Sequence, residues 1–326
     1  TATAGQDVLS LGGAGGYGYY RNAGGTLTTG QLAPGGNSAG ANTTGVFEQA
    51  GGSTTISAAG GWIVFGWQGT NANGVINIFD GSITNNSTTN NTTMAFGASG
   101  TNMGMLNLLG PGANFTHTIS GRGINLAAAA GNFGSWLNLN SGTLTTNFIN
   151  ATVSTTPSYL GFGGGRLQAA STGTLISGLT AATVYGGGAV IDSGTFAVTV
   201  SQPLLAPTGQ GVDTIPVADG GTGYIGAPAV RISGGGGTGA SAIAIVDLNP
   251  ASPTYGKVTG IQMTSAGSGY TSTPTVQLVG GGATTAATLN AATLNTQAAG
   301  GLTKFGAGTL TLSGSSTYSG GTLLNA

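Results

Sequence analysis

The sequence predicts an all-β protein: a right-handed parallel β-helix with three short strands in each rung and a small inserted β module. Short segments in which apolar and polar residues alternate recur about every 30 residues. Glycine and asparagine fill the positions between these segments, and glycine alone supplies 66 of the 326 residues. No window has the 3.6-residue period of an amphipathic helix. Frequent tight corners between short strands follow from this pattern.

Residues 1–207 are expected to form the rungs. Four first strands begin at Gly45, Gly74, Gly104 and Ser135, so their starts are 29, 30 and 31 residues apart. Second strands begin at Ser53, Ser82, Phe115 and Thr143, third strands at Trp62, Met94, Ile124 and Tyr159, and degenerate copies at Tyr19 and Arg166. A single rung cannot bury its own apolar face, so stacked rungs are expected to share one continuous core.

Residues 208–289 break this pattern and are expected to form the inserted, Gly-rich β module. Residues 220–236 match residues 266–282 with an offset of 46, which aligns Tyr224 with Tyr270 and Pro228 with Pro274. The module is therefore predicted to contain two internal repeats.

Tyr224 and Tyr270 are the candidate ligand-binding residues of the module. An exposed aromatic ring beside a Gly-rich loop can stack on a sugar ring. The alternative is structural, with each tyrosine packing on its own proline and fixing the turn. Both interpretations are open from sequence.

Residues 290–326 are expected to return to the β-helix, and residues 301–326 read GLTKFGAGTLTLSGSSTYSGGTLLNA. This segment resembles the passenger-associated transport repeat, also called the autotransporter-associated β-strand repeat. Ser316 departs from the asparagine that is common there. The matching residues are Leu302, Lys304, Gly306, Gly308, Thr309, Leu310, Leu312, Gly314, Thr317, Tyr318, Gly320, Gly321, Thr322, Asn325 and Ala326. The resemblance implies an exported β-helical passenger of a Gram-negative-type bacterium and supplies no catalytic residues.

Charge excludes several classes of function. Six Lys or Arg and seven Asp or Glu give a net charge of −1. No basic stripe could neutralise phosphates, so nucleic acid is not an expected partner. No apolar run reaches the ~18 residues of a membrane-spanning helix. With no cysteine, one histidine and scattered acids, no metal or cofactor is expected.

Catalytic motifs are present only in weak form. Residues 36–40 contain the G-x-S-x-G pattern around Ser38, but no helix follows and His117 is the only histidine. We expect His117 to lie on the strand face opposite Phe115, as a solvated ladder residue. A sugar-cleaving site needs paired carboxylates. Glu48 and Asp80 lie in neighbouring rungs at different offsets and need not share a face, so no enzyme is predicted.

The predicted function is that of a non-enzymatic, exported structural protein, a rod or fibre-forming subunit on the bacterial cell surface or in the extracellular matrix. A surface with so few charges has little to keep copies apart, and the open ends of a β-helix favour head-to-tail or lateral self-association. The alternative is an adhesin passenger that binds glycans or host surfaces through residues 208–289. The opening residues lack a basic and an apolar signal region, so we expect a processed piece of a longer polypeptide.

Overall fold

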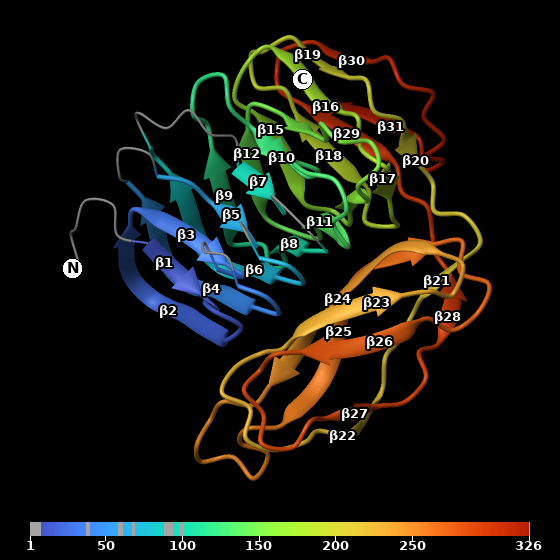
Figure 1. Cartoon of the computed structure of the whole chain (residues 1–326). Coiled ribbons are helices and arrows are strands. Elements are labelled where there is room, and N and C mark those ends of the chain that lie inside the picture. The colour runs from blue at the N-terminus through green and yellow to red at the C-terminus, as the bar shows by residue number, and fades with distance from the viewer. Residues whose placement is uncertain are drawn as a thin grey trace.

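The computed structural model describes residues 8–36, 40–57, 61–66, 69–87, 94–97 and 101–325. Across these ranges every regular element is a β-strand, and most strand pairs are parallel. The predicted all-β, β-helix-like architecture is confirmed (Figure 1). Three stacks of parallel strands run side by side along the coiled part of the chain.

The strands of stack 1 are β2 (Tyr17–Thr29), β4 (Thr44–Ile56), β6 (Asn73–Asn85), β8 (Met103–Leu108), β11 (Gly134–Leu139), β14 (Ser158–Phe162), β17 (Ala181–Val184) and β20 (Leu204–Leu205). Stack 2 contains the second halves of β2, β4 and β6, then β9 (Ala113–His117), β12 (Thr143–Thr146), β15 (Arg166–Ala169), β18 (Ala189–Asp192), β29 (Leu302–Phe305) and β31 (Thr322–Asn325). Stack 3 consists of β1 (Val8–Leu11), β3 (Gln31–Pro34), β5 (Val64–Phe65), β7 (Met94–Phe96), β10 (Ile124–Asn125), β13 (Ile149–Asn150), β16 (Gly173–Ser177), β19 (Val198–Val200) and β30 (Leu310–Leu312).

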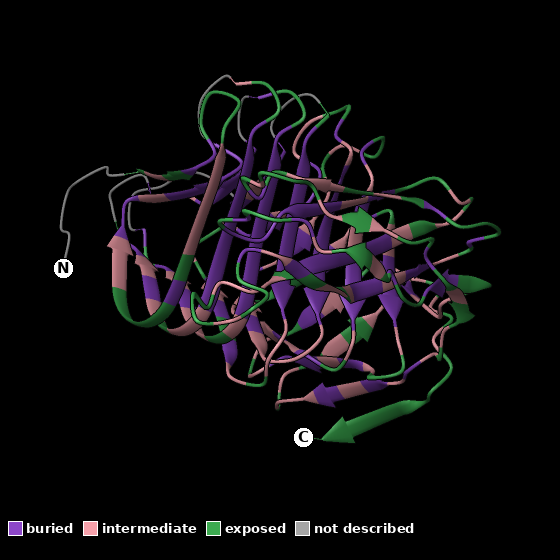
Figure 2. Ribbon diagram, turned by 90° about the horizontal axis from the view of Figure 1, so that it is seen from below, coloured by how far each residue is buried: buried purple, intermediate pink, exposed green. Residues whose placement is uncertain are grey.

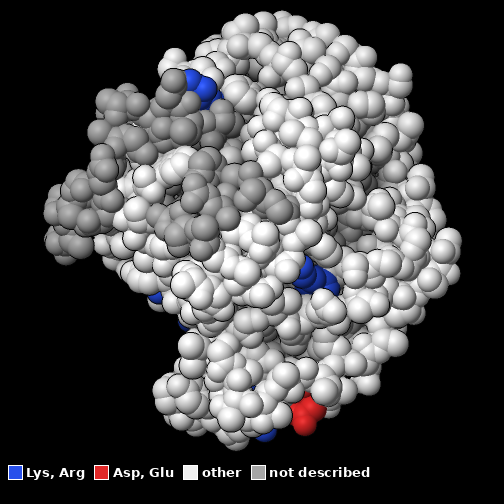
Figure 3. All heavy atoms as spheres, in the orientation of Figure 1, with Lys and Arg blue, Asp and Glu red and all other residues white. Residues whose placement is uncertain are grey.

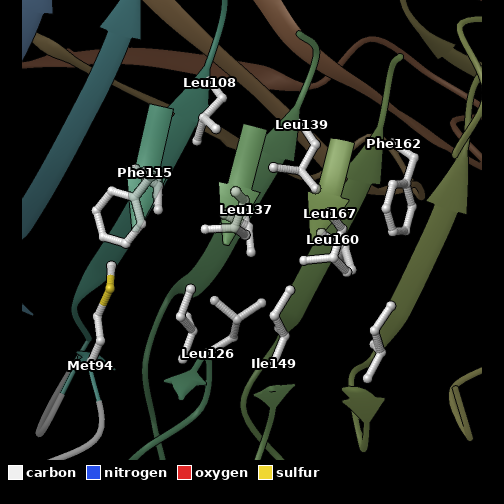
Figure 4. Close-up of a cluster of buried hydrophobic side chains, with 14 of the residues drawn as sticks. Met94, Leu108, Phe115, Leu126, Leu137, Leu139, Ile149, Leu160, Phe162 and Leu167 are labelled. Carbon is white, nitrogen blue, oxygen red and sulfur yellow. The ribbon is translucent and has the colours of Figure 1, made fainter. Parts of the chain in front are cut away.

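The core consists of apolar side chains that stack in register from coil to coil. In stack 1 one inward row passes through Phe47, Ile76, Leu106, Leu137 and Leu160, each at most 1% exposed. Figure 4 shows part of this interior, with side chains from all three stacks pointing toward one another. Each coil covers the apolar face of the previous one, so burial depends on stacking, as expected.

A row of small residues lies beside this apolar row, at Gly45, Gly74, Gly104 and Ser135. A Cβ atom added at Gly104 would lie 2.6 Å from a ring carbon of Phe96 in stack 3. Glycine is therefore needed here because stacks 1 and 3 approach closely. The predicted alignment of the four first strands matches the observed register.

One assigned strand start was wrong. Tyr159 was placed among the third strands, but it pairs with Trp136 in stack 1. The third strand of that coil is β13, which continues from β10. The error arises because the coil shortens: Ser135 pairs with Ser158, a spacing of 23 residues, and a 30-residue period then selects the wrong strand.

The face assigned to His117 was also wrong. Ala113, Phe115 and His117 are all fully buried, whereas Asn114 between them is exposed. His117 stacks between Asn85 and Thr146, inside the coil rather than in solvent. Burial lowers its pKa from 6.5 to about 4, against a smaller opposing effect of the Gly123 backbone.

Residues 210–296 form an antiparallel module that interrupts one coil. Its strands are β21 (Gln210–Val212), β22 (Val217–Asp219), β23 (Ala229–Ser233), β24 (Thr238–Val246), β25 (Val258–Ser268), β26 (Thr275–Val279), β27 (Thr288–Leu289) and β28 (Leu294–Thr296). β21 pairs with β28, β22 with β27, and the other four lie in the order β25-β24-β23-β26. The chain leaves stack 1 after β20. It resumes parallel stacking at β29, which pairs with β18.

The two internal repeats of the module are related by a local two-fold axis. Arg231 pairs with Gln277, its own equivalent at an offset of 46 residues. The backbone N–H of Ile225 donates to the Gly281 carbonyl at 2.9 Å, and the equivalent Thr271 donates to Gly235, also at 2.9 Å. Each repeat thus packs its tyrosine loop on the glycine turn of the other.

The module packs on the outward surface of stack 1 (Figures 1 and 2). The buried apolar residues at this interface are Val46, Val75, Met103, Met105, Trp136, Ala227, Ala229 and Ile243. The Tyr17 hydroxyl donates to the Ala227 carbonyl at 2.9 Å, and the Arg231 guanidinium lies 4.7 Å from the Phe133 ring centroid. The outward surface of stack 1 is therefore a second core rather than a solvated face.

A buried amide ladder runs through this interface. Asn138 donates through Nδ2 to Asn107 Oδ1 at 2.7 Å, and Asn107 donates to Asn77 Oδ1 at 2.8 Å. Asn77 in turn hydrogen-bonds the Glu48 carboxylate. An ionised carboxylate can only accept hydrogen bonds, so Glu48 ends the ladder. Ser241 of the module accepts from Asn138 Nδ2 at 3.0 Å. These hydrogen bonds fix the register of the module on the coils.

Replacing the central asparagine tests the ladder. Asn107→Leu keeps the branched shape of the side chain but leaves the Asn77 carbonyl oxygen without its donor in a buried site. We expect the free energy of unfolding to fall by about 2–3 kcal/mol in equilibrium denaturation. Thr116→Ala, half-buried on the outward surface of stack 2, is the control and should change it by about 0.5 kcal/mol or less. Equal effects of the two substitutions would show that the ladder contributes no specific stability.

The pH dependence of stability tests the burial of His117. The unfolded imidazole takes up a proton near pH 6.5 and the folded one only near pH 4, so unfolding binds a proton between these values. The free energy of unfolding should be at its full value above pH 6.5 and fall by about 3 kcal/mol as the pH drops to about 4. His117→Asn, which repeats Asn85 of the neighbouring coil, should remove this loss. A variant whose pH profile of denaturation matches that of the parent would refute the interpretation.

Candidate functional site

A pocket of about 460 Å³ opens where the first coils meet the module. Tyr19, Arg21 and Glu48 of stack 1 line its polar side, and Phe79 and Ile243 line its apolar side. β2 and β4 position the polar group because their residues stack in register, with Arg21 directly beside Glu48. The pocket combines apolar walls with converging polar groups, as small-molecule sites do.

The electrostatics of the pocket centre on Glu48. The Tyr19 hydroxyl donates to Glu48 Oε2 at 2.6 Å, and Arg21 Nε lies 3.8 Å from the same oxygen. Burial raises the pKa of the Glu48 carboxyl, opposed by the hydrogen bond from Tyr19, the charge of Arg21 and the hydrogen bond with Asn77. Burial, together with the charge of Glu48, raises the pKa of the Tyr19 hydroxyl far above its ordinary value.

Tyr224 and Tyr270 lie inside the module and are only 3% and 5% exposed. The Tyr224 hydroxyl accepts from the backbone N–H of Ala287 at 2.9 Å. A Cβ atom added at Gly281 would meet both the Tyr224 ring and Pro228. Both tyrosines are therefore buried rather than exposed, as the packing alternative expects.

The residues considered for catalysis do not assemble. Asp80 is exposed and does not form a carboxylate pair with Glu48. Glu48 stacks on Asn77, whereas Asp80 pairs with Ala50. Asp192 forms an ion pair with Arg166 at 3.2 Å. Ser38 lies outside the described residues. In the part of the chain that is described, no group of three or more His, Asp or Glu side chains comes together.

The last described coil has an open apolar end. β31 pairs on one side only, with β29, and all four of its residues are exposed. Leu324 continues the inward row that passes through Leu144, Leu167, Ile191 and Lys304. Yet Leu324 is 72% exposed, and a hollow of about 280 Å³ lies beside it.

The pocket was missed in the sequence because its walls come from residues about 200 positions apart. One signal was available. Once Gly18 is aligned with Gly45, Arg21 falls opposite Glu48, and oppositely charged residues stack directly. In a chain with so few charged residues, a directly stacked pair of opposite charges indicates a candidate site.

The comparisons with known proteins identify one family. Residues 302–326 match the model described as passenger-associated-transport-repeat. No curated protein and no solved structure matches the chain. Among the described residues no helix has the length and hydrophobicity to cross a membrane. The match covers β29, β30 and β31, the strands that form the open end. Residues 302–326 are therefore a passenger-associated transport repeat, the repeat of autotransporter passengers.

Proposed function

We propose that the chain is a non-enzymatic structural protein of the bacterial cell surface, a rod of three-strand coils with one inserted module, which joins to a second copy end to end. The passenger-associated transport repeat supports an extracellular or cell-surface location in a Gram-negative bacterium. The observation that carries the self-association is the sparse charge, since six positive and seven negative residues leave little repulsion between copies.

The open end offers both backbone and side-chain contacts. The inward positions of β29, Leu302 and Lys304, are covered by the following coil, whereas those of β31, Thr322 and Leu324, are exposed. Leu302, Leu310 and Leu312 line the hollow next to Leu324. Figure 2 shows β31 as an exposed strand close to the C-terminal end. A further coil placed here would bury these leucines and complete the backbone pairing of β31.

The β2 edge has the strand direction that such a coil needs. β2 is the other edge of the same sheet and runs parallel to all the strands stacked on it. Joining the β31 edge of one copy to the β2 edge of another would continue the parallel stacking. This contact is head to tail and does not close on itself, so repetition gives a filament.

The sparse charge favours such assembly. Six positive and seven negative residues leave most of the surface uncharged, and the face in Figure 3 is almost free of charged atoms. Repulsion between copies is therefore weak and responds little to salt. A non-enzymatic role also accords with the dispersed acids, since Glu48 and Asp192 are each engaged by an arginine.

An adhesin is the alternative function. The pocket between the coils and the module favours it, because it is concave, partly polar and open to solvent. Its recognition residues would be Glu48 and its neighbours rather than Tyr224 and Tyr270, which are buried.

Two substitutions of adjacent leucines test the end-to-end contact. Leu324→Asp replaces an apolar side chain of the inward row with a carboxylate that stacks on Lys304. A further coil would cut this charge pair off from solvent, which costs more than burying the leucine, so assembly should be strongly weakened. Leu323→Asp puts the same charge on the outward side of β31 and should leave assembly largely intact. The readouts are negative-stain electron microscopy and sedimentation velocity, at low salt and at ~1 M salt, where the Debye length is about 3 Å.

The parent chain should form filaments in both salt conditions. Isolated short rods in both, or equal loss of assembly in the two aspartate variants, would contradict the proposed contact. Circular dichroism of the variants checks that each one folds.

A further inference from the structure

The pocket between the first coils and the module has the features of a built recognition site. Its volume of about 460 Å³ falls in the range of small-molecule sites, about 300–1,000 Å³. Glu48 is 9% exposed, and its carboxylate is held in place by Tyr19 and by the end of the amide ladder. Its geometry is therefore set before any ligand arrives.

The polar groups of the pocket call for a ligand that both donates and accepts hydrogen bonds. The carboxylates of Glu48 and Asp247 accept, the guanidinium of Arg21 donates, and the Gln262 amide does both. An apolar ligand would displace solvent from these polar groups without replacing its hydrogen bonds, which is costly. The ligand must therefore carry several hydroxyl or amide groups.

The charges of the pocket argue against an ionic ligand. Arg21 and Glu48 largely cancel, because their charged atoms lie 3.8 Å apart. Asp247 at the rim is held in its own loop, where Thr254 donates to Oδ2 at 2.6 Å. The Asp247 carboxylate has no positive partner there among the described residues, so its negative charge repels anions. The positive charge of Arg21 repels cations that approach Glu48.

The apolar side of the pocket suits the carbon face of a sugar ring. Phe79 and Ile243 belong to the interface between coil and module, and Val246 continues the same wall. A pyranose carries hydroxyl groups around its edge and C–H groups on its faces, so it can satisfy both sides at once.

We propose that this pocket binds a neutral hexose unit of a glycan, with Glu48 and Gln262 accepting and donating hydrogen bonds to its hydroxyl groups. The inference does not depend on end-to-end assembly, since the pocket and β31 share no residue.

Binding is tested with the full chain and three neutral disaccharides: cellobiose, maltose and lactose. Isothermal titration or saturation-transfer NMR should show saturable binding of at least one of them, and glucuronic acid should bind more weakly. Gln262→Ala removes an exposed amide of the pocket and should weaken binding about tenfold. Gln277→Ala, on β26 of the same sheet and outside the pocket, is the matched control and should bind as the parent does.

Glu48→Gln should also weaken binding about tenfold, and thermal denaturation shows whether it still folds. If it does not fold, Gln262→Ala decides the question alone. No saturable binding of any of the three disaccharides, or unchanged binding in Gln262→Ala, would overturn the proposal. Leu324→Asp should bind the sugar as the parent does, so the assembly and glycan proposals can fail separately.

Discussion

In-register stacking along the coil axis is the constraint on which the rest of this structure depends. Phe47, Ile76 and Leu106 are buried because each lies directly on the next, not because any coil encloses them alone. In a polar row, each side chain must be able to bond to the same kind of side chain on the next coil. The asparagine ladder does this because each amide both donates and accepts hydrogen bonds. Side chains of like charge would repel each other in such a row. The ion pairs of Arg21 with Glu48 and of Arg166 with Asp192 therefore join opposite charges on adjacent coils.

The outward surface of stack 1 imposes a second constraint. Met105 and Trp136 point away from the coil interior, and they would be exposed without the module. The module meets them with alanine and isoleucine, and a pocket remains where the first coils carry Tyr19, Arg21 and Glu48. The same packing that stabilises the fold therefore also shapes the candidate site.

Alternation and spacing predicted the all-β class and the aligned strands at Gly45, Gly74 and Gly104, because a stacked row repeats at nearly constant intervals. A constant interval does not hold at Tyr159, because the coil there is shorter and the residue pairs with Trp136 in stack 1. The side of His117 could have been predicted, since a residue two positions after Phe115 lies on the same strand face. The burial of Tyr224 and the pocket around Glu48 could not, because both depend on segments distant in sequence.

The placement of the module has a mechanical consequence. Arrays of coils usually contact only their neighbours and can lose one coil at a time from an end. Here Tyr17 of the first coil, Asn138 of a middle coil and Tyr185 of a later one are all bonded to the module, through Ala227, Ser241 and Ser265. The module acts as a brace across the array. Tension along the axis is shared among these coils, and fraying that begins at β2 must also detach the brace, so the braced coils melt as one block.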